Sequence, residues 1–125
     1  MSSKILLVDD SGLARRSSRR ILERAGYLVV EAEDGMSAIE QYFVEKPDVV
    51  LLDLVMKGMY GLDVLAKLRE MDPEARVVVL SADIQTSSRE LVQAAGAAGF
   101  LNKPADPQQM LDAVARAVER GDSWS

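Results

Sequence analysis

The sequence contains neither cysteine nor histidine among its 125 residues. Without cysteine, the protein cannot form disulfide bonds, thiolate metal sites or a thiol nucleophile. Without histidine, it lacks the most common general base and the usual protein ligand of zinc. Catalysis or metal binding by this chain would therefore depend on oxygen ligands and on the amines and guanidinium groups of its basic residues.

The sequence also has no strong excess of charge and no long hydrophobic run. Its 20 acidic and 15 basic residues give a net charge of −5, which argues against binding to a nucleic-acid backbone as the main activity. No apolar stretch approaches the roughly 20 residues of a membrane-spanning helix, and the first residues lack the apolar segment of a secretory signal. We expect no direct nucleic-acid partner, no membrane partner and a cytoplasmic location.

Length and composition fit one globular domain. Hydrophobic residues make up 48% of the chain and charged residues 28%, so a disordered or fibrous protein is not expected. A chain of this length buries roughly two-thirds of its unfolded surface. No internal repeat or linker interrupts the sequence. We expect a single domain over residues 1–125, with its core at residues 4–120 and a short tail at residues 121–125.

Short runs rich in Val, Leu and Ile alternate with amphipathic stretches along the chain. This alternation is typical of an α/β protein with a parallel sheet wrapped by helices. The predicted strands are Lys4 to Val8, Leu28 to Ala32, Val49 to Leu54, Arg76 to Leu80 and Gly99 to Leu101. The second strand contains Glu31 and is the least apolar, so we expect it at an edge of the sheet.

Apolar residues at helical spacing predict a helix after each strand. The helices are expected to begin after Asp10, at an Asp34 cap, near Gly61, at Ile84 and at an Asp106 cap, and to end at Gly26, before Pro47, before Pro73, near Ala95 and at Gly121. The spacing places Phe43 on the apolar stripe of the second helix and Leu62 on that of the third. The fourth helix is expected to be the weakest, because its Thr and Ser residues at 86–88 are poor helix formers.

Four of the predicted strands end on polar residues. These residues are Asp9 and Asp10 after KILLV, Asp53 after VVLL, Ser81 after VVVL and Lys103 after GFLN. The carboxyl ends of parallel strands lie along one edge of the sheet, where open α/β sheets bind ligands, so we expect these side chains to converge. Three carboxylates, a hydroxyl and an ammonium suit an oxygen-binding cation and a phosphoryl group.

The three carboxylates predict a metal site. Asp53 interrupts the apolar run from Val49 to Met56, where an unpaired buried carboxylate would be costly. Asp9 and Asp10 repel each other unless a cation lies between them. With oxygen ligands alone, Mg²⁺ or Mn²⁺ is favoured over zinc. The alternatives are structural: Asp53 caps a turn at a strand end, and Asp9, Asp10 or Ser11 caps the first helix.

Lys103 and Ser81 each have two interpretations. Near three carboxylates, the Lys103 ammonium is suited to hold a phosphoryl oxygen, but a lysine before Pro104 also fits an ordinary turn. Ser81 either donates its hydroxyl to the same group or caps a helix. A carboxylate nucleophile remains a route to a phosphoryl intermediate, because the sequence has no GxxxxGK[ST], GxGxxG or GxSxG motif.

Five arginines lie on the first predicted helix and are expected to group on its outward side. They are Arg15, Arg16, Arg19, Arg20 and Arg24. The pattern fits either a solvated face that aids solubility or a docking surface for an acidic or helical partner. The residues alone do not decide between these interpretations.

In chain order, four segments resemble the receiver domain of two-component response regulators, of the single-domain chemotaxis type. They are VDDS at residues 8–11, LLDLVM at 51–56 followed by Gly61, LSA at 80–82 and NKP at 102–104. The resemblance extends from Lys4 to Arg120. It implies a doubly wound (βα)5 fold with a five-stranded parallel sheet of order 2-1-3-4-5, as in flavodoxin-like proteins.

The resemblance also assigns roles to the residues at the sheet edge. Asp53 corresponds to the phosphoacceptor. Asp10, Asp53 and the main-chain carbonyl of Val55 correspond to direct Mg²⁺ ligands, and Asp9 to a ligand that acts through water. Lys103 corresponds to the phosphate-binding lysine, and a cis peptide bond to the following proline is expected.

Further positions of the family carry the switch and influence the lifetime of the phosphorylated state. Ser81 corresponds to the switch hydroxyl, and Phe100 corresponds to the switch aromatic, where tyrosine is more common. Val55 and Asp83 occupy positions that modulate dephosphorylation in this family. The resemblance therefore implies a signalling domain rather than an enzyme, although one that assists its own phosphorylation and dephosphorylation.

The implied phosphodonor is a phosphohistidine on a sensor kinase or phosphotransfer protein. The first helix is the usual kinase contact of the family, which favours docking through Arg15, Arg16 and Arg19. The implied output surface, for a partner that the sequence does not name, comprises the fourth helix, the fifth strand and the fifth helix. Phosphorylation of Asp53 with Mg²⁺ is expected to change this surface.

Three other functions fit parts of the pattern. An aspartate-nucleophile phosphatase of the haloacid dehalogenase type needs a DxD motif after the first strand, where this chain has Asp9, Asp10 and Ser11. A carrier of flavin mononucleotide needs a Ser/Thr-rich loop at the same place, where this chain has SGLARR. A scaffold that binds partners without phosphorylation is distinguished from the signalling switch by a phosphorylation assay.

Overall fold

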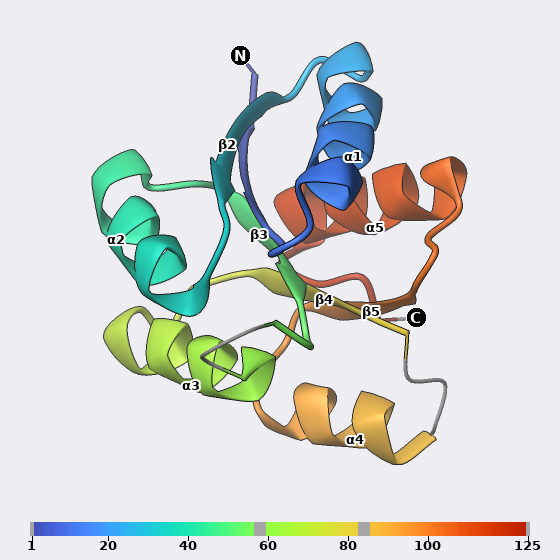
Figure 1. The fold of residues 1–125 in the computed structure, drawn as a ribbon. Coiled ribbons are helices and arrows are strands. Elements are labelled where there is room, and N and C mark those ends of the chain that lie inside the picture. The colour runs from blue at the N-terminus through green and yellow to red at the C-terminus, as the bar shows by residue number, and fades with distance from the viewer. Residues whose placement is uncertain (1, 57–59, 83–85, 125) are drawn as a thin grey trace.

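Five parallel strands form one sheet in the order β2-β1-β3-β4-β5 (Figure 1). The structure is a computed structural model that describes residues 2–56, 60–82 and 86–124, without the side chains of residues 86–88. The strands are β1 Lys4–Val8, β2 Leu28–Ala32, β3 Val49–Asp53, β4 Val77–Ser81 and β5 Gly99–Asn102. The sheet confirms the doubly wound, flavodoxin-like α/β fold and its 2-1-3-4-5 order, with β2 at an edge.

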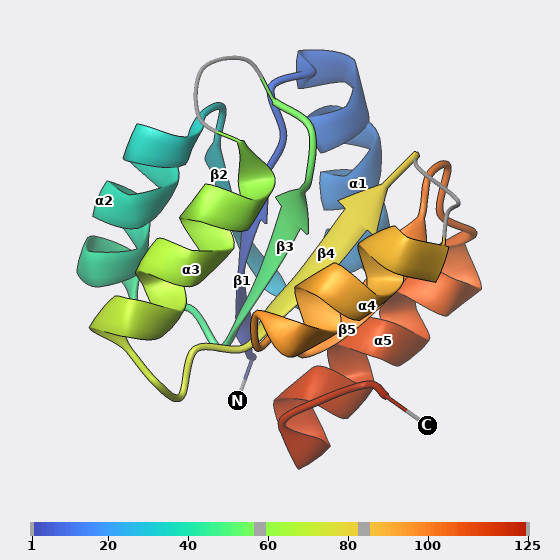
Figure 2. The same ribbon diagram turned by 90° about the horizontal axis from the view of Figure 1, so that it is seen from below.

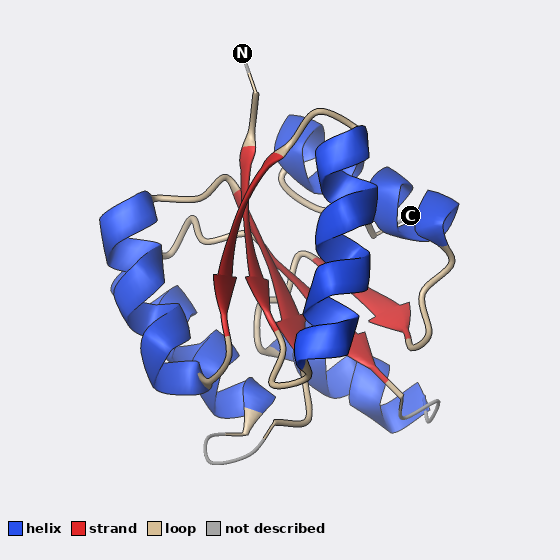
Figure 3. Cartoon of the chain, turned by 45° about the horizontal axis from the view of Figure 1, so that its top comes forward, coloured by secondary structure: helices blue, strands red, loops and turns tan. Residues whose placement is uncertain are grey.

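Helices cover both faces of the sheet (Figures 1 and 3). They are α1 Gly12–Arg24, α2 Gly35–Glu45, α3 Gly61–Met71, α4 Thr86–Ala94 and α5 Pro107–Arg120. Figure 2 shows α2, α3 and α4 on one face, with α1 and α5 behind the sheet. Within the described ranges, no helix combines the length and the apolar character that crossing a membrane requires.

The sheet separates two apolar cores. One core lies beneath α2, α3 and α4 and includes Leu52, Val79 and Leu68. The other lies beneath α1 and α5 and includes Leu51 and Leu22. Every residue of β3 and β4 is buried, because helices cover both faces of these central strands. Polar side chains on these strands are therefore confined to the strand ends.

Among the described residues, polar side chains cap the N-termini of α1, α2 and α5. The sequence predicted the caps of α2 and α5. The Asp34 carboxylate accepts the backbone N–H of Ser37 at 2.8 Å, and the Asp106 carboxylate caps α5. For α1, the cap is Ser11, whose hydroxyl accepts the N–H of Ala14 at 3.2 Å. Capping by the serine means that neither Asp9 nor Asp10 serves as the N-cap of α1.

Some details of the predicted helices are wrong. The Phe43 side chain is 60% exposed, because only a narrow stripe of α2, led by the buried Ala38, faces the core. On α3, Leu62 is only half-buried, while the unpredicted Val64 is completely buried. The expected start of the fourth helix at Ile84 lies outside the described residues.

The segment after α5 does not simply trail from the fold. Gly121 adopts a φ of 90° and turns the chain back. The Ser123 N–H then donates to the carbonyl of Ala98 at 2.7 Å, and the Trp124 indole packs against the core beneath α4. Most of the expected tail is therefore part of the packed structure.

At Gly61 the backbone passes very close to the backbone of Leu54, just after the end of β3. The Gly61 N–H donates to the Leu54 carbonyl at 2.9 Å, and a Cβ at this position would lie only 2.5 Å from that same oxygen. Gly61→Ala should therefore lower the free energy of unfolding by about 1–3 kcal/mol, measured by urea denaturation. Gly12→Ala is the control, because a Cβ there meets nothing closer than 3.8 Å. Equal stability of the two variants would contradict this interpretation.

Candidate functional site

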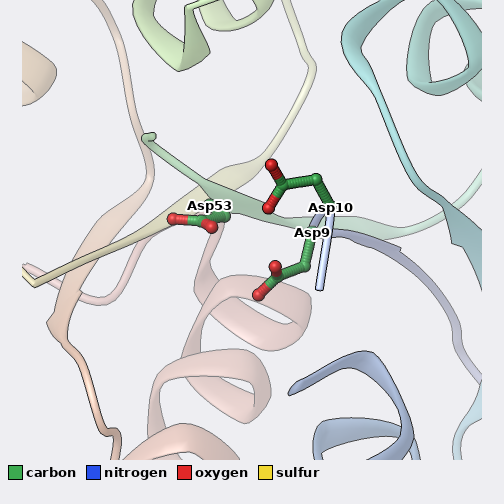
Figure 4. A group of neighbouring side chains, drawn as sticks. All are labelled: Asp9, Asp10 and Asp53. Carbon is green, nitrogen blue, oxygen red and sulfur yellow. The ribbon is translucent and has the colours of Figure 1, made fainter. Parts of the chain in front are cut away.

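The carboxyl ends of β1 and β3 bring three carboxylates together (Figure 4). One carboxylate oxygen from each of Asp9, Asp10 and Asp53 lies within 4.8 Å of those of the others. Asp9 and Asp53 are each only 6% exposed, whereas Asp10 is exposed. β1 and β3 are neighbours in the sheet, so their ends deliver these side chains to one place. This confirms the predicted convergence of the three aspartates.

Lys103 joins two of these carboxylates from the end of β5. Its Nζ lies 2.8 Å from Asp9 Oδ2 and 3.2 Å from Asp53 Oδ2. The backbone also fixes the lysine, because its N–H donates to the Ser81 carbonyl at 2.8 Å. The bond from Lys103 to Pro104 is cis, as the resemblance implied. Lys103 is therefore part of the site rather than an ordinary turn residue.

Burial and charge act in opposite directions on the carboxylate of Asp53. Burial raises the pKa of Asp53 above its ordinary value, and the negative charge of Asp9 adds to this effect. The charge and hydrogen bond of Lys103 oppose it. Burial alone would lower the pKa of Lys103, but its hydrogen bond to Asp9 and the charge of Asp53 outweigh burial and raise it. The lysine is thus held in its charged form.

The donor set of the site suits a divalent cation. Among the described residues, three clustered carboxylates offer oxygen atoms to one place, and the Lys103 ammonium pairs with two of them. Oxygen ligands from carboxylates, joined by water and backbone carbonyls, are those that Mg²⁺ prefers. The donor set therefore fits a divalent metal site formed by Asp9, Asp10 and Asp53.

The other predicted site residues lie at or after the ends of β3 and β4 and within β5, as far as the structure describes them. Ser81 ends β4, is fully buried and lies beside β5 in register with Asn102. Val55 follows β3; its side chain is 63% exposed, and its N–H donates to Asp53 Oδ1 at 3.3 Å. Phe100 of β5 is half-buried against the core beneath α4. Asp83 lies outside the described residues.

Two of the five arginines of α1 point toward the sheet. Arg15 Nε lies 3.0 Å from Glu31 of β2, and Arg19 Nη1 lies 2.6 Å from the same carboxylate. The pKa of Glu31 is lowered, chiefly by its hydrogen bond from Arg19. The predicted grouping of all five on an outward face is therefore wrong for these two, while Arg16 and Arg20 are exposed.

Arg15 also supports the loop that carries the aspartates. Its Nη1 donates to the main-chain carbonyl of Asp9 at 2.5 Å, while its Nε remains on Glu31. In the sequence, Glu31 indicated only that β2 is an edge strand. A charged residue within an otherwise apolar strand, opposite a helix rich in arginine, was the signal for this pairing.

A cavity of about 370 Å³ lies between α1 and α5, beside Lys103. Its lining is mainly apolar and includes Ala14, Ile21, Pro104 and Met110. Exposed Arg16 and Arg20 lie on α1, which forms one side of the cavity. The cavity therefore adjoins Lys103, whereas these arginines lie on another face of α1.

Asp53→Asn should stabilise the metal-free protein at neutral pH by about 1 kcal/mol, because it removes a buried charge repelled by Asp9. The raised folded pKa of Asp53 means that this carboxyl contributes stability in acid, which is lost as the pH rises through that pKa. The gain from asparagine should therefore shrink in acid. Urea denaturation at neutral and at acidic pH measures the difference in the free energy of unfolding between the variant and the wild type. Asp63→Asn, at an exposed position of α3, is the control and should show no gain. A less stable Asp53→Asn protein at neutral pH would contradict the expectation.

Comparison with known proteins agrees with this site. A family model described as the response regulator receiver domain matches residues 5–115. The chemotaxis protein CheY of Thermotoga maritima is 36% identical over 115 residues, which cover 91% of this chain and 96% of that protein. The nitrate/nitrite response regulator protein NarP of Escherichia coli is 41% identical over 120 residues, or 94% of this chain but 55% of that protein.

A solved structure shows the same architecture. The crystal structure of a two-component response regulator of the LuxR family from Aurantimonas sp. superposes with a TM-score of 0.91 at 31% identity, covering 98% of this chain and 88% of that one. The family model, the relatives and the acidic site beside a lysine all agree. The chain therefore belongs to the response regulator receiver domain family, is CheY-like, and is a phosphoacceptor signalling module.

Proposed function

We propose that the protein accepts a phosphoryl group on Asp53 from a phosphohistidine of a sensor kinase or phosphotransfer protein. The observation that carries the proposal is the ammonium of Lys103, which lies between Asp9 and Asp53 beside a third carboxylate. This arrangement combines a nucleophile, a metal site and a cation for phosphoryl oxygens. The whole chain, residues 1–125, would act as one receiver unit with its core at residues 4–120.

Mg²⁺ is the metal proposed for the site, with Mn²⁺ as an alternative. Asp10, Asp53 and the main-chain carbonyl of Val55 would hold the ion directly, and Asp9 would hold it through water. When bound, the ion supplies positive charge against the oxygens of the phosphoryl group. The close spacing of the carboxylate oxygens supports this assignment.

In the proposed reaction, a carboxylate oxygen of Asp53 forms a bond to phosphorus. The bond from phosphorus to the donor imidazole nitrogen breaks, and the imidazole leaves with the bonding electrons and takes up a proton. Lys103 neutralises Asp53 before transfer and can then donate to a phosphoryl oxygen. The Ser81 hydroxyl, at the end of the adjacent strand β4, would donate to another oxygen.

The proposed donor docks against α1. Exposed Arg16 and Arg20 would contact acidic groups of the donor, and the apolar cavity between α1 and α5 would accept an apolar side chain beside Lys103. Arg15 and Arg19 were also expected at this contact. Both pair with Glu31. The pairing holds Arg15 inward, whereas the Arg19 side chain remains 39% exposed and still lies beside Arg16 and Arg20. A cytoplasmic location is part of the proposal.

The proposed output follows from a change in the surface of α4, β5 and α5. A phosphoryl group adds acceptor oxygens that Ser81 and Lys103 can bond, which would draw the chain after β4 inward. Phe100 would then rotate toward the space that opens. Val55 and Asp83 would influence the lifetime of the phosphorylated state.

Asp53 is expected to be the sole phosphoacceptor. Incubation with acetyl phosphate and Mg²⁺ should add one phosphoryl group to the wild-type protein, detected by intact mass. Asp53→Asn should remain unmodified, while Asp63→Asn, an exposed aspartate of α3, should react as the wild type does. Equal modification of Asp53→Asn and the wild type would overturn the assignment and favour a scaffold that works without phosphorylation.

Arg15 and Arg16 should have separable effects. Arg15→Ala removes support from the Asp9 carbonyl, so it should weaken Mg²⁺ binding by about three- to tenfold, measured by NMR titration. It should also slow modification by acetyl phosphate. Arg16→Ala should leave both properties unchanged and slow only transfer from a protein phosphodonor. If both variants reacted more slowly only with the protein phosphodonor, and kept wild-type Mg²⁺ binding and acetyl phosphate modification, Arg15 would act in docking instead.

A further inference from the structure

Trp124, the single tryptophan of the chain, is held between α4 and the connection from α4 to β5. Its indole N–H donates to the carbonyl of Ala97 at 2.9 Å. The guanidinium carbon of Arg89, in α4, lies 5.4 Å from the centre of the ring, within the range of a cation–π contact. The ring also packs against the core beneath α4.

Ser123 fixes the same segment against the start of β5. Its N–H and its hydroxyl both donate to the carbonyl of Ala98, at 2.7 and 3.3 Å. Gly99, the first residue of β5, leaves room for this approach, because a Cβ there would lie 2.0 Å from the Ser123 hydroxyl. β5 is an edge strand, and such an edge is an open site for pairing with other chains.

These contacts lie on the surface that the proposed function assigns to output. We propose that Ser123 and Trp124 form an intramolecular cover over the α4–β5 surface, which favours the unphosphorylated arrangement of α4 and must be released before a partner binds there. The occupant of this surface is thus a segment of the same chain. The proposal rests on the proposed function for its link to phosphorylation.

The cover can influence α4 because the described side chains of this helix make little buried contact with the rest of the fold. Among the side chains of α4 that the structure describes, residues 89–94, only Val92 is buried. By comparison, α3 buries Val64, Leu65 and Leu68. The contact of Trp124 with Arg89 therefore adds to the burial of Val92 in holding the described part of α4 against the connection that contains Ala97.

Movement of α4 would separate the partners of the indole. Arg89 belongs to the helix, whereas Ala97 is anchored beside β4 and β5, because the neighbouring Ala98 N–H donates to Val77. The ring cannot keep both contacts if the helix shifts against the sheet. By linkage, a contact present only in the unphosphorylated arrangement opposes phosphorylation, and phosphorylation weakens that contact equally.

Trp124 fluorescence tests the link directly, since no other tryptophan contributes. The probe is beryllofluoride with Mg²⁺, a stable mimic of the phosphoryl group. In the wild-type protein, the emission should shift to longer wavelength and quenching by acrylamide should increase about twofold as the ring becomes exposed. Asp53→Asn should show neither change.

Two variants test the energetic coupling. Trp124→Ala should bind beryllofluoride about three- to tenfold more tightly than the wild type, because the cover no longer opposes the switched state. Arg89→Ala should show a smaller increase of the same sign. Arg24→Ala, which removes the same kind of side chain from an exposed position on α1, should bind as the wild type does.

Hydrogen exchange without beryllofluoride tests the cover independently of phosphorylation. Trp124→Ala should accelerate exchange of the amides of residues 92–98, and unchanged exchange would overturn the cover. If beryllofluoride shifts the NMR signals around Asp53 while Trp124 emission stays constant, the link fails and the proposed function stands. If Asp53 itself does not respond, the proposed function fails, and the exchange measurement still decides whether the cover exists.

Discussion

The Lys103 ammonium is the cation that holds the ends of β1 and β3 together in the described structure. Its contacts with Asp9 and Asp53 offset the repulsion between two buried carboxylates at the ends of adjacent strands. Among the described residues, Lys103 pairs with two of the three carboxylates in the cluster. The lysine therefore keeps the ends of the two strands together, and the clustered carboxylate oxygens form a donor set that suits a divalent metal ion.

The sheet determines where such a cluster can form, and for that reason the sequence revealed it. Strands buried on both faces tolerate polar side chains only at their ends, so Asp53 and Ser81 stood out after unbroken apolar runs. Alternating runs and helices indicated the α/β class, but they fit several parallel topologies. The family motifs predicted the strand order. The register was not predicted and is seen only in the structure, where β3 pairs with β1 and β4.

Periodicity was less informative where packing depends on neighbours distant in sequence. It placed Phe43 on a buried stripe, but α2 lies against the edge of the sheet and buries a narrower face. It placed Arg15 with exposed arginines, because the spacing along α1 does not show that Glu31 lies opposite. It treated Trp124 as part of a tail, although the turn at Gly121 returns the chain to the α4–β5 connection.

The arrangement of β4 and β5 restricts how a signal leaves the site. The two strands are paired from Val78 with Gly99 to Ser81 with Asn102, so a shift of one strand against the other would break the register along the whole pair. Val92 alone is buried among the described side chains of α4, so displacing this helix breaks fewer contacts. In the proposed switch, a change at Ser81 would therefore be transmitted at lower cost through α4 than through the sheet, and the contacts of Trp124 with the helix and with Ala97 would lie on that route.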